Sequence, residues 1–392
     1  MQLKIDPPSL ETYSSDRLEI DRLASPQKST QVILVRHGQS TYNERKLYQG
    51  DSDESLLTEQ GKCDASSTGI FLKKLLVDGI DAIYTSPLTR VQQTTREILS
   101  ALKRPIPIAA SDKLQEIHMS SWQGLSYKYV KTQFENDYSC WQERPHEFSF
   151  STPKGEPYFP VVELFDRARE FWQEILPQHR GKTLLIVAHG GTNRALMATA
   201  LGWTGDRYHL LQQSNCGVSI LEFPPENRSP QLTALNLTAH LGETLPKAKG
   251  CKEGLRLLLL SAATPEAQVR QLAQHLQSQP IDFILSSDDS DRLADCLVRT
   301  QPTAVHLHVR RDDLPQAWQH TLRSRQNRPL GQFPLTTGLV VAREEIAQSL
   351  LSEAFNCSSL PLHPGTLSVI HYPANGRPPV LQALNFQLTQ QP

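Results

Sequence analysis

The sequence lacks long apolar runs, an excess of charge of one sign, and closely spaced cysteines. A transmembrane helix needs about 18 or more consecutive apolar residues, and no such run occurs, so a membrane-spanning helix is excluded. The 40 Lys and Arg residues nearly balance the 41 Asp and Glu residues. Because nucleic-acid-binding domains are usually strongly basic, we expect no nucleic-acid partner.

Cysteine is scarce, at six residues in 392. Neither the cysteines nor the histidines have the spacing of a metal site, so we expect no metal and no cofactor. The scattered cysteines predict reduced thiols and a cytoplasmic protein. Residues 1–30 are polar and contain no apolar core of a secretory signal, so we expect a polar N-terminal arm there.

One segment has the pattern of a strand that ends at a reactive site. The apolar residues Val32–Val35 run directly into Arg36, His37 and Gly38. A continuous apolar run is typical of a parallel strand that is buried on both faces, and ligands bind beyond the carboxyl ends of such strands. Gly38 permits a tight turn, and Arg36 offers the two-pronged hydrogen bonding that suits a phosphate. We therefore predict a phosphate site at this strand end.

Two further segments repeat this pattern. The apolar run Thr183–Ala188 leads into His189 and Gly190, and Ile80–Ser86 predicts a strand followed by a helix with Arg90 in its first turn. Since the carboxyl ends of neighbouring parallel strands lie at one edge of the sheet, we expect these residues to meet the first segment. The helix starts after both His-Gly pairs add backbone donors for an anion, which makes Gly38 and Gly190 candidate phosphate ligands.

Two histidines, two arginines and one carboxylate predict a phosphoryl-transfer reaction. His37 can attack phosphorus through a ring nitrogen and form a covalent phosphohistidine. Arg36, Arg90 and His189 would stabilise the charge on the transferring group. Glu116 would protonate the leaving oxygen and then accept a proton from the hydrolytic water. The arginines supply the positive charge that a metal ion supplies in other phosphoryl-transfer enzymes.

These segments resemble the histidine phosphatase superfamily, in the branch that contains cofactor-dependent phosphoglycerate mutase. The resemblance covers roughly residues 31–240 and preserves the order of the motifs. It implies an α/β fold with a mostly parallel sheet flanked by helices, and the same roles for the five residues above. It also implies substrate-pocket positions for Asn43, Gln49 and Gly50.

The same resemblance separates a mutase from a phosphatase. Mutases of the family hold the substrate carboxylate with a lysine and an Arg-Arg pair in the segment after Gln-Gly-Leu. Here the segment after Gln123–Leu125 contains no such pair and only Arg144. Without this clamp the phosphorylated enzyme would lose its phosphoryl group to water. The sequence therefore favours a phosphatase, here a metal-independent phosphoric monoester hydrolase acting on a small-molecule phosphate ester.

The substrate is suggested by other parts of the chain. The segments 151–164 and 210–219, with the C-terminal extension, resemble plant-type 2-carboxy-D-arabinitol 1-phosphate phosphatases, which act on sugar phosphates that inhibit Rubisco. Xylulose 1,5-bisphosphate is a second substrate of this kind. Phosphoserine phosphatase, phosphoglycerate mutase and a non-catalytic scaffold protein are the alternatives. Candidate ligands for a second anionic group are His118, Lys128, Lys131, Arg144 and Lys154.

The C-terminal part repeats the apolar segments of the first part. Segments 256–264, 281–287 and 339–343 correspond to segments 32–40, 80–86 and 185–189. Segment 372–385 pairs with segment 223–236 without a gap. The sequence therefore predicts two copies of one fold in tandem: an arm over 1–30, a catalytic domain over 31–241, a linker over 242–254, and a second copy over 255–392.

The second copy is predicted to be degenerate and inactive. In this alignment, the positions of Arg36, His37 and Gly38 are occupied by Leu260, Ser261 and Ala262. His189 corresponds to Arg343, and Arg90 to Asp291, whose carboxylate would repel a phosphate. We expect the second copy to cover the surface through which single-domain relatives dimerise, which gives a monomer with an internal pseudo-dimer.

Overall fold

The computed structural model describes residues 28–103, 105–225, 228–248, 253–326, 335–374 and 376–387. The predicted arm over 1–30 lies outside these residues except for its last three. One twelve-stranded sheet runs through the described chain in the order β11-β10-β12-β9-β13-β14-β8-β7-β1-β6-β2-β3, and β4 and β5 form a separate pair. None of the described helices is long and apolar enough to cross a membrane.

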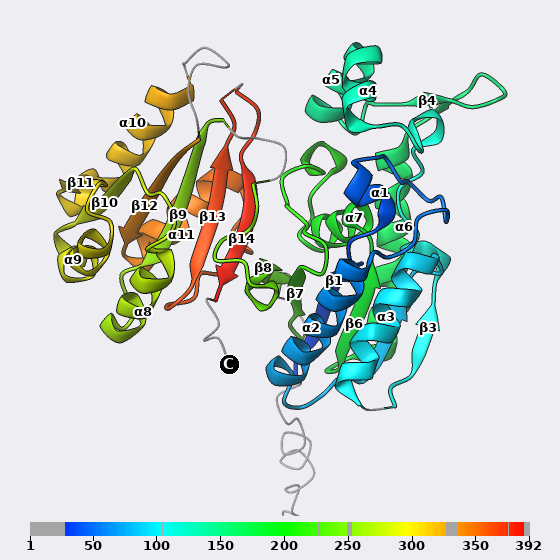
Figure 1. Ribbon diagram of the computed structural model, residues 1–392, viewed down its shortest axis with the longest axis horizontal. Helices are drawn as coiled ribbons and strands as arrows, with labels where there is room; N and C mark the ends of the chain where they lie inside the picture. The colour runs from blue at the N-terminus through cyan, green and yellow to red at the C-terminus, as the bar shows by residue number, and fades with distance from the viewer. Residues whose placement is uncertain are drawn as a thin grey trace, which may run out of the picture.

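The first half contributes the green, cyan and blue part of the sheet (Figure 1). Its strands are β1 (Thr30–Arg36), β2 (Ala82–Thr85), β3 (Ile108–Ala110), β4 (Phe150–Ser151), β5 (Pro157–Tyr158), β6 (Thr183–Ala188), β7 (Val218–Phe223) and β8 (Gln231–Leu237). Its helices are α1 (Thr41–Arg45), α2 (Glu59–Leu75), α3 (Thr89–Leu102), α4 (Tyr127–Gln133), α5 (Glu135–Glu143), α6 (Pro160–Ile175) and α7 (Gly190–Ala200).

The second half contributes the yellow, orange and red part (Figure 1). Its strands are β9 (Leu255–Ser261), β10 (Phe283–Ser287), β11 (Val305–Val309), β12 (Thr336–Ala342), β13 (Leu367–Tyr372) and β14 (Val380–Phe386). Its helices are α8 (Glu266–Leu276), α9 (Asp291–Thr300), α10 (Leu314–Gln326) and α11 (Glu344–Phe355). In the predicted linker, the described residues 242–248 and 253–254 form neither helix nor strand.

The predicted α/β fold with a mostly parallel, helix-flanked sheet is confirmed for the first half. β1 pairs in parallel with β6, and β2 pairs in parallel with both β6 and β3. In the large sheet, β7 pairs antiparallel with both β1 and β8, and the separate β4–β5 pair is antiparallel as well. The carboxyl ends of β1, β2 and β6 therefore lie side by side at one edge of the sheet.

The apolar runs form strands because both faces of the sheet are covered. Val32 and Leu34 pack in one core layer, which also contains residues of α6 and α7. Ile33 and Val35 point to the opposite face and pack with residues of α2 and α3. This two-sided burial explains why the strand shows no alternation of apolar and polar residues.

A cap of α4, α5 and the β4–β5 hairpin lies beyond the carboxyl ends of β1, β2 and β6 (Figure 1). An aromatic cluster anchors the cap to the fold. Trp122 is buried and its ring contacts those of Trp141, Phe148 and Phe150. The cap is therefore fixed by packing close to Glu116, which precedes Trp122 in the same segment.

The strand pairing of the second half follows the same pattern as that of the first. β9 lies between the parallel β12 and the antiparallel β13, and β10 pairs in parallel with β12 and β11. The two halves join where β8 and β14 pair antiparallel at Leu235 and Leu384. The sheet is thus continuous across both halves (Figure 1).

This pairing corrects the sequence alignment of the two halves by one residue. The backbone N–H of His37 donates to Ala188 at 2.9 Å, and that of Ala262 donates to the corresponding Ala342 at 2.7 Å. Ala262, not Ser261, therefore occupies the position of His37, and Ser261 occupies that of Arg36. The alignment was wrong because the run Leu257–Leu260 contains no polar residue that marks its register.

Candidate active site

Two histidines from neighbouring strand ends face each other at the centre of the site. His37 follows β1 and His189 follows β6, and their ring centroids are 5.3 Å apart with the planes inclined by 65°. His37 is 2% exposed and His189 is fully buried. The parallel pairing of β1 with β6 brings them together, because each histidine is the first residue beyond its strand.

The turn after β1 determines which ring nitrogen of His37 carries the proton. Its Nδ1 lies 2.8 Å from the carbonyl oxygen of Gly38, which can only accept a hydrogen bond. Nδ1 is therefore the donor, and Nε2 of the neutral ring carries the lone pair. A side chain at position 38 would overlap the backbone of Gly61, so the turn requires glycine. The Gly38 amide donates to Thr94 Oγ1 at 3.0 Å.

His189 is held by Ser86, which the sequence analysis did not single out. His189 Nε2 lies 2.8 Å from Ser86 Oγ. That oxygen accepts from the Leu88 amide at 3.4 Å, so its own hydrogen can point to His189. Burial and the nearby charge of Arg90 lower the pKa of His189, so the ring is neutral near pH 7. His189 therefore does not carry the positive charge that the sequence analysis expected. Its neutral ring can still donate a hydrogen bond from Nδ1.

The two predicted arginines are fixed through their terminal nitrogens. Arg90, at the start of α3, is fully buried and donates to the carbonyl oxygens of Ser52 at 2.6 Å and Gly50 at 2.9 Å. Burial lowers the pKa of Arg90 to about 10, which leaves it protonated at pH 7. Arg36 donates from Nη1 to the carbonyl oxygen of Gln213 at 2.8 Å.

Three nitrogen atoms of this cluster are buried without a hydrogen-bond partner. They are Nε of Arg36, Nε of Arg90 and Nδ1 of His189. Buried polar groups in native proteins are nearly always hydrogen-bonded, so donors of this kind indicate an acceptor-rich ligand. Two of these nitrogen atoms belong to positively charged guanidinium groups, which favours an anionic ligand, as expected for a phosphate site.

Glu116 is held against the start of α7. Its carboxylate accepts hydrogen bonds of 3.0 Å from the backbone amides of Ile117, Gly191 and Thr192. A side chain at position 191 would overlap Glu116 itself, so this glycine keeps the carboxylate close to the helix. Glu116 also interacts electrostatically with both Arg36 and Arg90.

The remaining predicted pocket residues support these groups. Asn43 Oδ1 accepts from the Ser40 amide at 3.3 Å, and Gln49 Oε1 accepts from Ser40 Oγ at 2.9 Å. Gly50 adopts a positive φ of 53° and supplies a carbonyl oxygen to Arg90. Gly190 is the first residue of α7 and packs against Arg36.

Two predicted substrate ligands are exposed, in contrast to the buried histidines. His118 is exposed and its Nδ1 lies 2.9 Å from Asp51 Oδ1, while Lys128 is exposed on α4. Arg144 is paired with Glu147 at 2.8 Å. The charge of Arg144 is thus partly neutralised by a neighbouring carboxylate.

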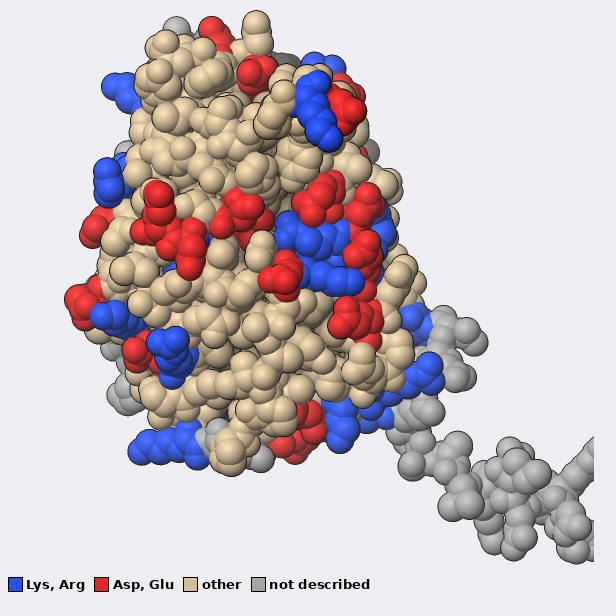
Figure 2. Space-filling model, turned by 90° about the vertical axis from the view of Figure 1, so that its right-hand side faces the viewer, with Lys and Arg blue, Asp and Glu red and all other residues tan. Residues whose placement is uncertain are grey.

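An open cleft of about 830 Å³ adjoins the site, and Glu116 is part of its lining. His118, Tyr158, Lys113 and Arg167 line it, and so do six acidic residues: Asp51, Asp112, Glu116, Glu163, Asp166 and Glu170. Lys113 and Arg167 are themselves paired with Glu170 and Glu163. On the face shown in Figure 2, acidic and basic side chains accordingly lie intermixed.

Asn215 is a site residue that the sequence analysis missed. Its Nδ2 donates to the carbonyl oxygens of His37 at 3.0 Å and Gly38 at 3.2 Å, and to Asn43 Oδ1 at 2.9 Å. It lies in a polar stretch before β7 and has no spacing relation to the other motifs. Only the fold brings it to the histidine turn.

The sequence profile of the histidine phosphatase superfamily (branch 1) matches residues 32–238. The chain belongs to this superfamily. The wheat (Triticum aestivum) 2-carboxy-D-arabinitol-1-phosphatase is 37% identical over 237 residues, which are 59% of this chain and 46% of that protein. A probable 2-carboxy-D-arabinitol-1-phosphatase of Arabidopsis thaliana is 40% identical over 233 residues, 58% of this chain and 46% of that protein.

A bacterial protein is also similar. Phosphoserine phosphatase 1 of Hydrogenobacter thermophilus is 30% identical over 212 residues, which are 54% of this chain and 94% of that protein. The chain thus spans nearly all of this bacterial phosphoserine phosphatase but only about half the length of the plant relatives it matches.

Cys216 lies beside Arg36, whose carbonyl oxygen accepts from the Cys216 amide, but its thiol is predicted to be unreactive. It is fully buried, and burial raises the pKa of its thiol to about 12, so the nucleophilic thiolate is absent at pH 8. We expect iodoacetamide to label the exposed Cys63 in the native protein and to label Cys216 only after denaturation. Peptide mass spectrometry at pH 8 checks this, and rapid native labelling of Cys216 would contradict it.

Proposed function

We propose that this protein is a phosphatase that hydrolyses a small phosphate monoester through a phosphohistidine on His37. The observation that carries the proposal is the cluster of His37, His189, Arg36 and Arg90, with three buried donors that have no protein partner. A phosphoryl group offers enough oxygen atoms for all three, and it would place phosphorus beside the His37 ring.

In the first step, Nε2 of His37 attacks phosphorus and forms a P–N bond while the P–O bond to the leaving group breaks. The hydrogen bond from Nδ1 to Gly38 supports this, because it leaves the lone pair on Nε2. The carboxyl group of Glu116 gives its proton to the leaving oxygen. Arg36, Arg90 and His189 stabilise the charge on the phosphoryl oxygens.

In the second step, a water molecule attacks phosphorus and the P–N bond breaks, which returns the electron pair to Nε2 of His37. Glu116, now a carboxylate, accepts the proton of the water. The α7 amides that bind this carboxylate hold it in place between the two steps. We assign the positive charge that the reaction needs to the two arginines and to the start of α7, without a metal ion.

A sugar phosphate is the proposed substrate class. The similarity to 2-carboxy-D-arabinitol-1-phosphatases over 58–59% of the chain supports it. The cleft beside Glu116 is rich in carboxylates, which repel a doubly charged second phosphate more strongly than the single carboxylate of 2-carboxy-D-arabinitol. We therefore place 2-carboxy-D-arabinitol 1-phosphate before xylulose 1,5-bisphosphate. The similarity to a phosphoserine phosphatase over nearly its whole length supports phosphoserine as the second candidate.

Phosphate release from a panel of esters tests this function. The panel contains 2-carboxy-D-arabinitol 1-phosphate, xylulose 1,5-bisphosphate, phosphoserine and both phosphoglycerates, with EDTA present throughout. We expect the highest kcat/KM for the first ester and the loss of all turnover in His37→Ala. Selectivity for phosphoserine would move the substrate to the amino-acid class, and release by His37→Ala would refute the mechanism. Transfer of the phosphoryl group between substrate oxygens without phosphate release would indicate a mutase. No activity on any ester of the panel would indicate a scaffold protein.

The acid role of Glu116 predicts a dependence on the leaving group. Glu116→Gln should lower kcat/KM for alkyl phosphates by about 100-fold or more, the order that general acid catalysis contributes. The loss should be much smaller for p-nitrophenyl phosphate, because its leaving group needs no proton. Steady-state kinetics on both esters check this. Equal losses would show that Glu116 positions the phosphate instead of donating a proton.

We propose that the second half is a degenerate, inactive copy of the first. The repeated strand order and the gapless pairing of segments 223–236 and 372–385 support this. An alanine stands at the position of His37, and Arg343, at the position of His189, pairs with Asp289 at 2.5 Å. An internal carboxylate thus neutralises the cation that an anion would need. This leaves the half without the means to bind phosphate.

The second half is also proposed to act as an internal dimer partner through the β8–β14 junction. The antiparallel pairing there uses the edge strand that a single-domain phosphatase would leave open. We expect a monomer of 44.1 kDa in size-exclusion chromatography with light scattering, across micromolar concentrations. A stable homodimer that forms through the catalytic half would contradict the proposal.

A further inference from the structure

The loop between α7 and β7, residues 210–216, holds the catalytic turn by hydrogen bonds. Arg36 Nη1 donates to the carbonyl oxygen of Gln213, and the Cys216 amide donates to that of Arg36 at 3.0 Å. Asn215 binds the carbonyl oxygens of both His37 and Gly38. The position of Arg36 and His37 thus depends on this loop, which we call the support loop.

The opposite side of the support loop is bound by β14, a strand of the second half. The Leu381 amide donates to the carbonyl oxygen of Leu210 at 2.8 Å, and the Gln212 amide donates to that of Leu381 at 3.0 Å. Gln382 Nε2 adds a buried bond of 3.3 Å to Gln212 Oε1. The loop therefore lies between the catalytic turn and the inactive half.

Asn236 on β8 connects the support loop to the second half through one side chain. Its Oδ1 accepts from the Ser214 amide at 2.7 Å, and its Nδ2 donates to the carbonyl oxygen of Gln382 at 2.8 Å. Asn236 is fully buried with a positive φ of 53°. Both bonds are satisfied inside the protein, so the loss of either leaves a buried group unpaired.

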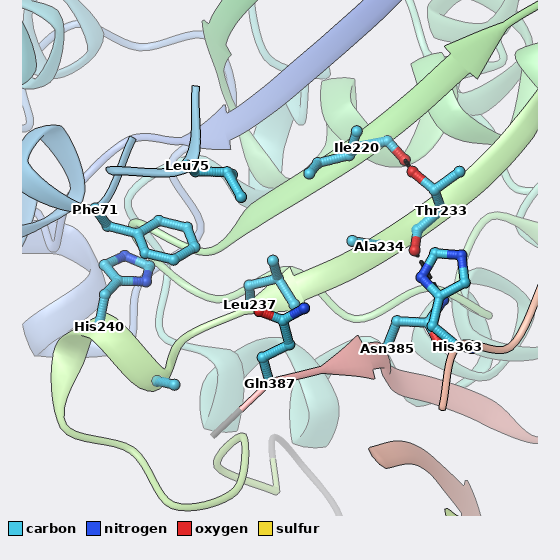
Figure 3. Close-up of a pocket in the computed structure, with 11 residues that line it drawn as sticks. Phe71, Leu75, Ile220, Thr233, Ala234, Leu237, His240, His363, Asn385 and Gln387 are labelled. Atoms are coloured by element: carbon cyan, nitrogen blue, oxygen red, sulfur yellow. Dashed lines mark hydrogen bonds between the residues drawn. The ribbon is translucent and has the colours of Figure 1, made fainter. Parts of the chain in front are cut away.

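Asn385 on β14 makes the equivalent contacts on the other side of the junction. Its Oδ1 accepts from the His363 amide at 2.8 Å, and its Nδ2 donates to the carbonyl oxygen of Thr233 at 2.8 Å. It has the same φ of 53°. Figure 3 shows Asn385, His363 and Thr233 together beside a cavity of about 120 Å³. Asn385 therefore repeats the geometry of Asn236 but supports a loop of the second half.

We propose that the second half is a positioning element of the catalytic site, which acts through β14, Asn236 and the support loop on Arg36 and His37. The second half touches none of the reacting groups in this scheme and keeps the phosphate-binding groups in place. The proposal rests on the phosphatase function proposed above, since it concerns the same Arg36 and His37.

The test replaces Asn236 by Asp, which keeps the acceptor for Ser214 but removes the donor to Gln382. Asp tolerates the left-handed backbone almost as well as Asn. We expect Asn236→Asp to weaken orthovanadate binding and to lower kcat/KM for p-nitrophenyl phosphate by about ten-fold or more, since a small misplacement of a positioned group can cost up to about 100-fold. Gln382→Leu, which adds no charge and removes the bond to Gln212, should act in the same direction.

Asn385→Asp is the matched control. It removes the donor to Thr233 at the same junction, together with the donor to Pro361 in the second half, and should lower the melting temperature at least as much as Asn236→Asp. Its vanadate affinity and kcat/KM should stay within about two-fold of the wild type, because a change that shares no hydrogen-bond partner with the site rarely couples to it. Equal losses of affinity in Asn385→Asp and Asn236→Asp would overturn the proposal, as would wild-type affinity in both Asn236→Asp and Gln382→Leu.

Hydrogen exchange separates this proposal from the proposed function. Peptides that cover residues 208–217 should exchange faster in Asn236→Asp and Gln382→Leu than in the wild type and in Asn385→Asp. If the wild type neither binds vanadate nor hydrolyses any ester, the phosphatase function fails, and the exchange pattern still decides whether the second half supports the loop. Unchanged exchange in Asn236→Asp and Gln382→Leu would overturn the coupling.

Discussion

The parallel pairing of β1 with β6 is the constraint on which the site depends, since each strand is followed at once by a histidine. Their register is fixed by the bond from the His37 amide to Ala188. A shift by one residue would turn the apolar side chains to the wrong faces of a sheet that is covered on both sides. The positions of the two rings therefore follow from the packing of the core, which makes the site as rigid as the sheet.

The other groups of the site are placed by elements that start at the same edge. Arg90 comes from the start of α3, and its buried guanidinium is fixed by the carbonyl oxygens of Ser52 and Gly50. Glu116 is fixed by the amides that begin α7, the helix that follows His189. One helix start thus supports the carboxylate and directly follows His189. This arrangement explains why glycine is needed at 191, where a side chain would displace Glu116.

The junction of the two halves gives a physical reason for the proposed inactive copy to persist. Its strands keep the apolar residues that complete the shared sheet, and its Asn385 keeps the bond to Thr233. The residues at its strand ends bear no such constraint, and Arg343 with Asp289 forms an ion pair there instead. The second half can therefore keep its packing and hydrogen bonds across the junction without catalytic residues of its own. The proposed support of Arg36 and His37 needs only that packing and those hydrogen bonds.

Sequence and tertiary structure determine different parts of this protein. The sequence by itself determined the buried strands, the histidines that follow two of them, and the family, because apolar runs and the motifs beside them are local. The sequence alignment placed β9 one residue out of register, since the leucines before Ser261 are equivalent in pattern. Only the tertiary structure decided that Ser86 holds His189 and that Asn215 holds the turn at His37. These partners are 103 and 178 residues apart, and only the packing of strands and loops brings them within hydrogen-bond distance.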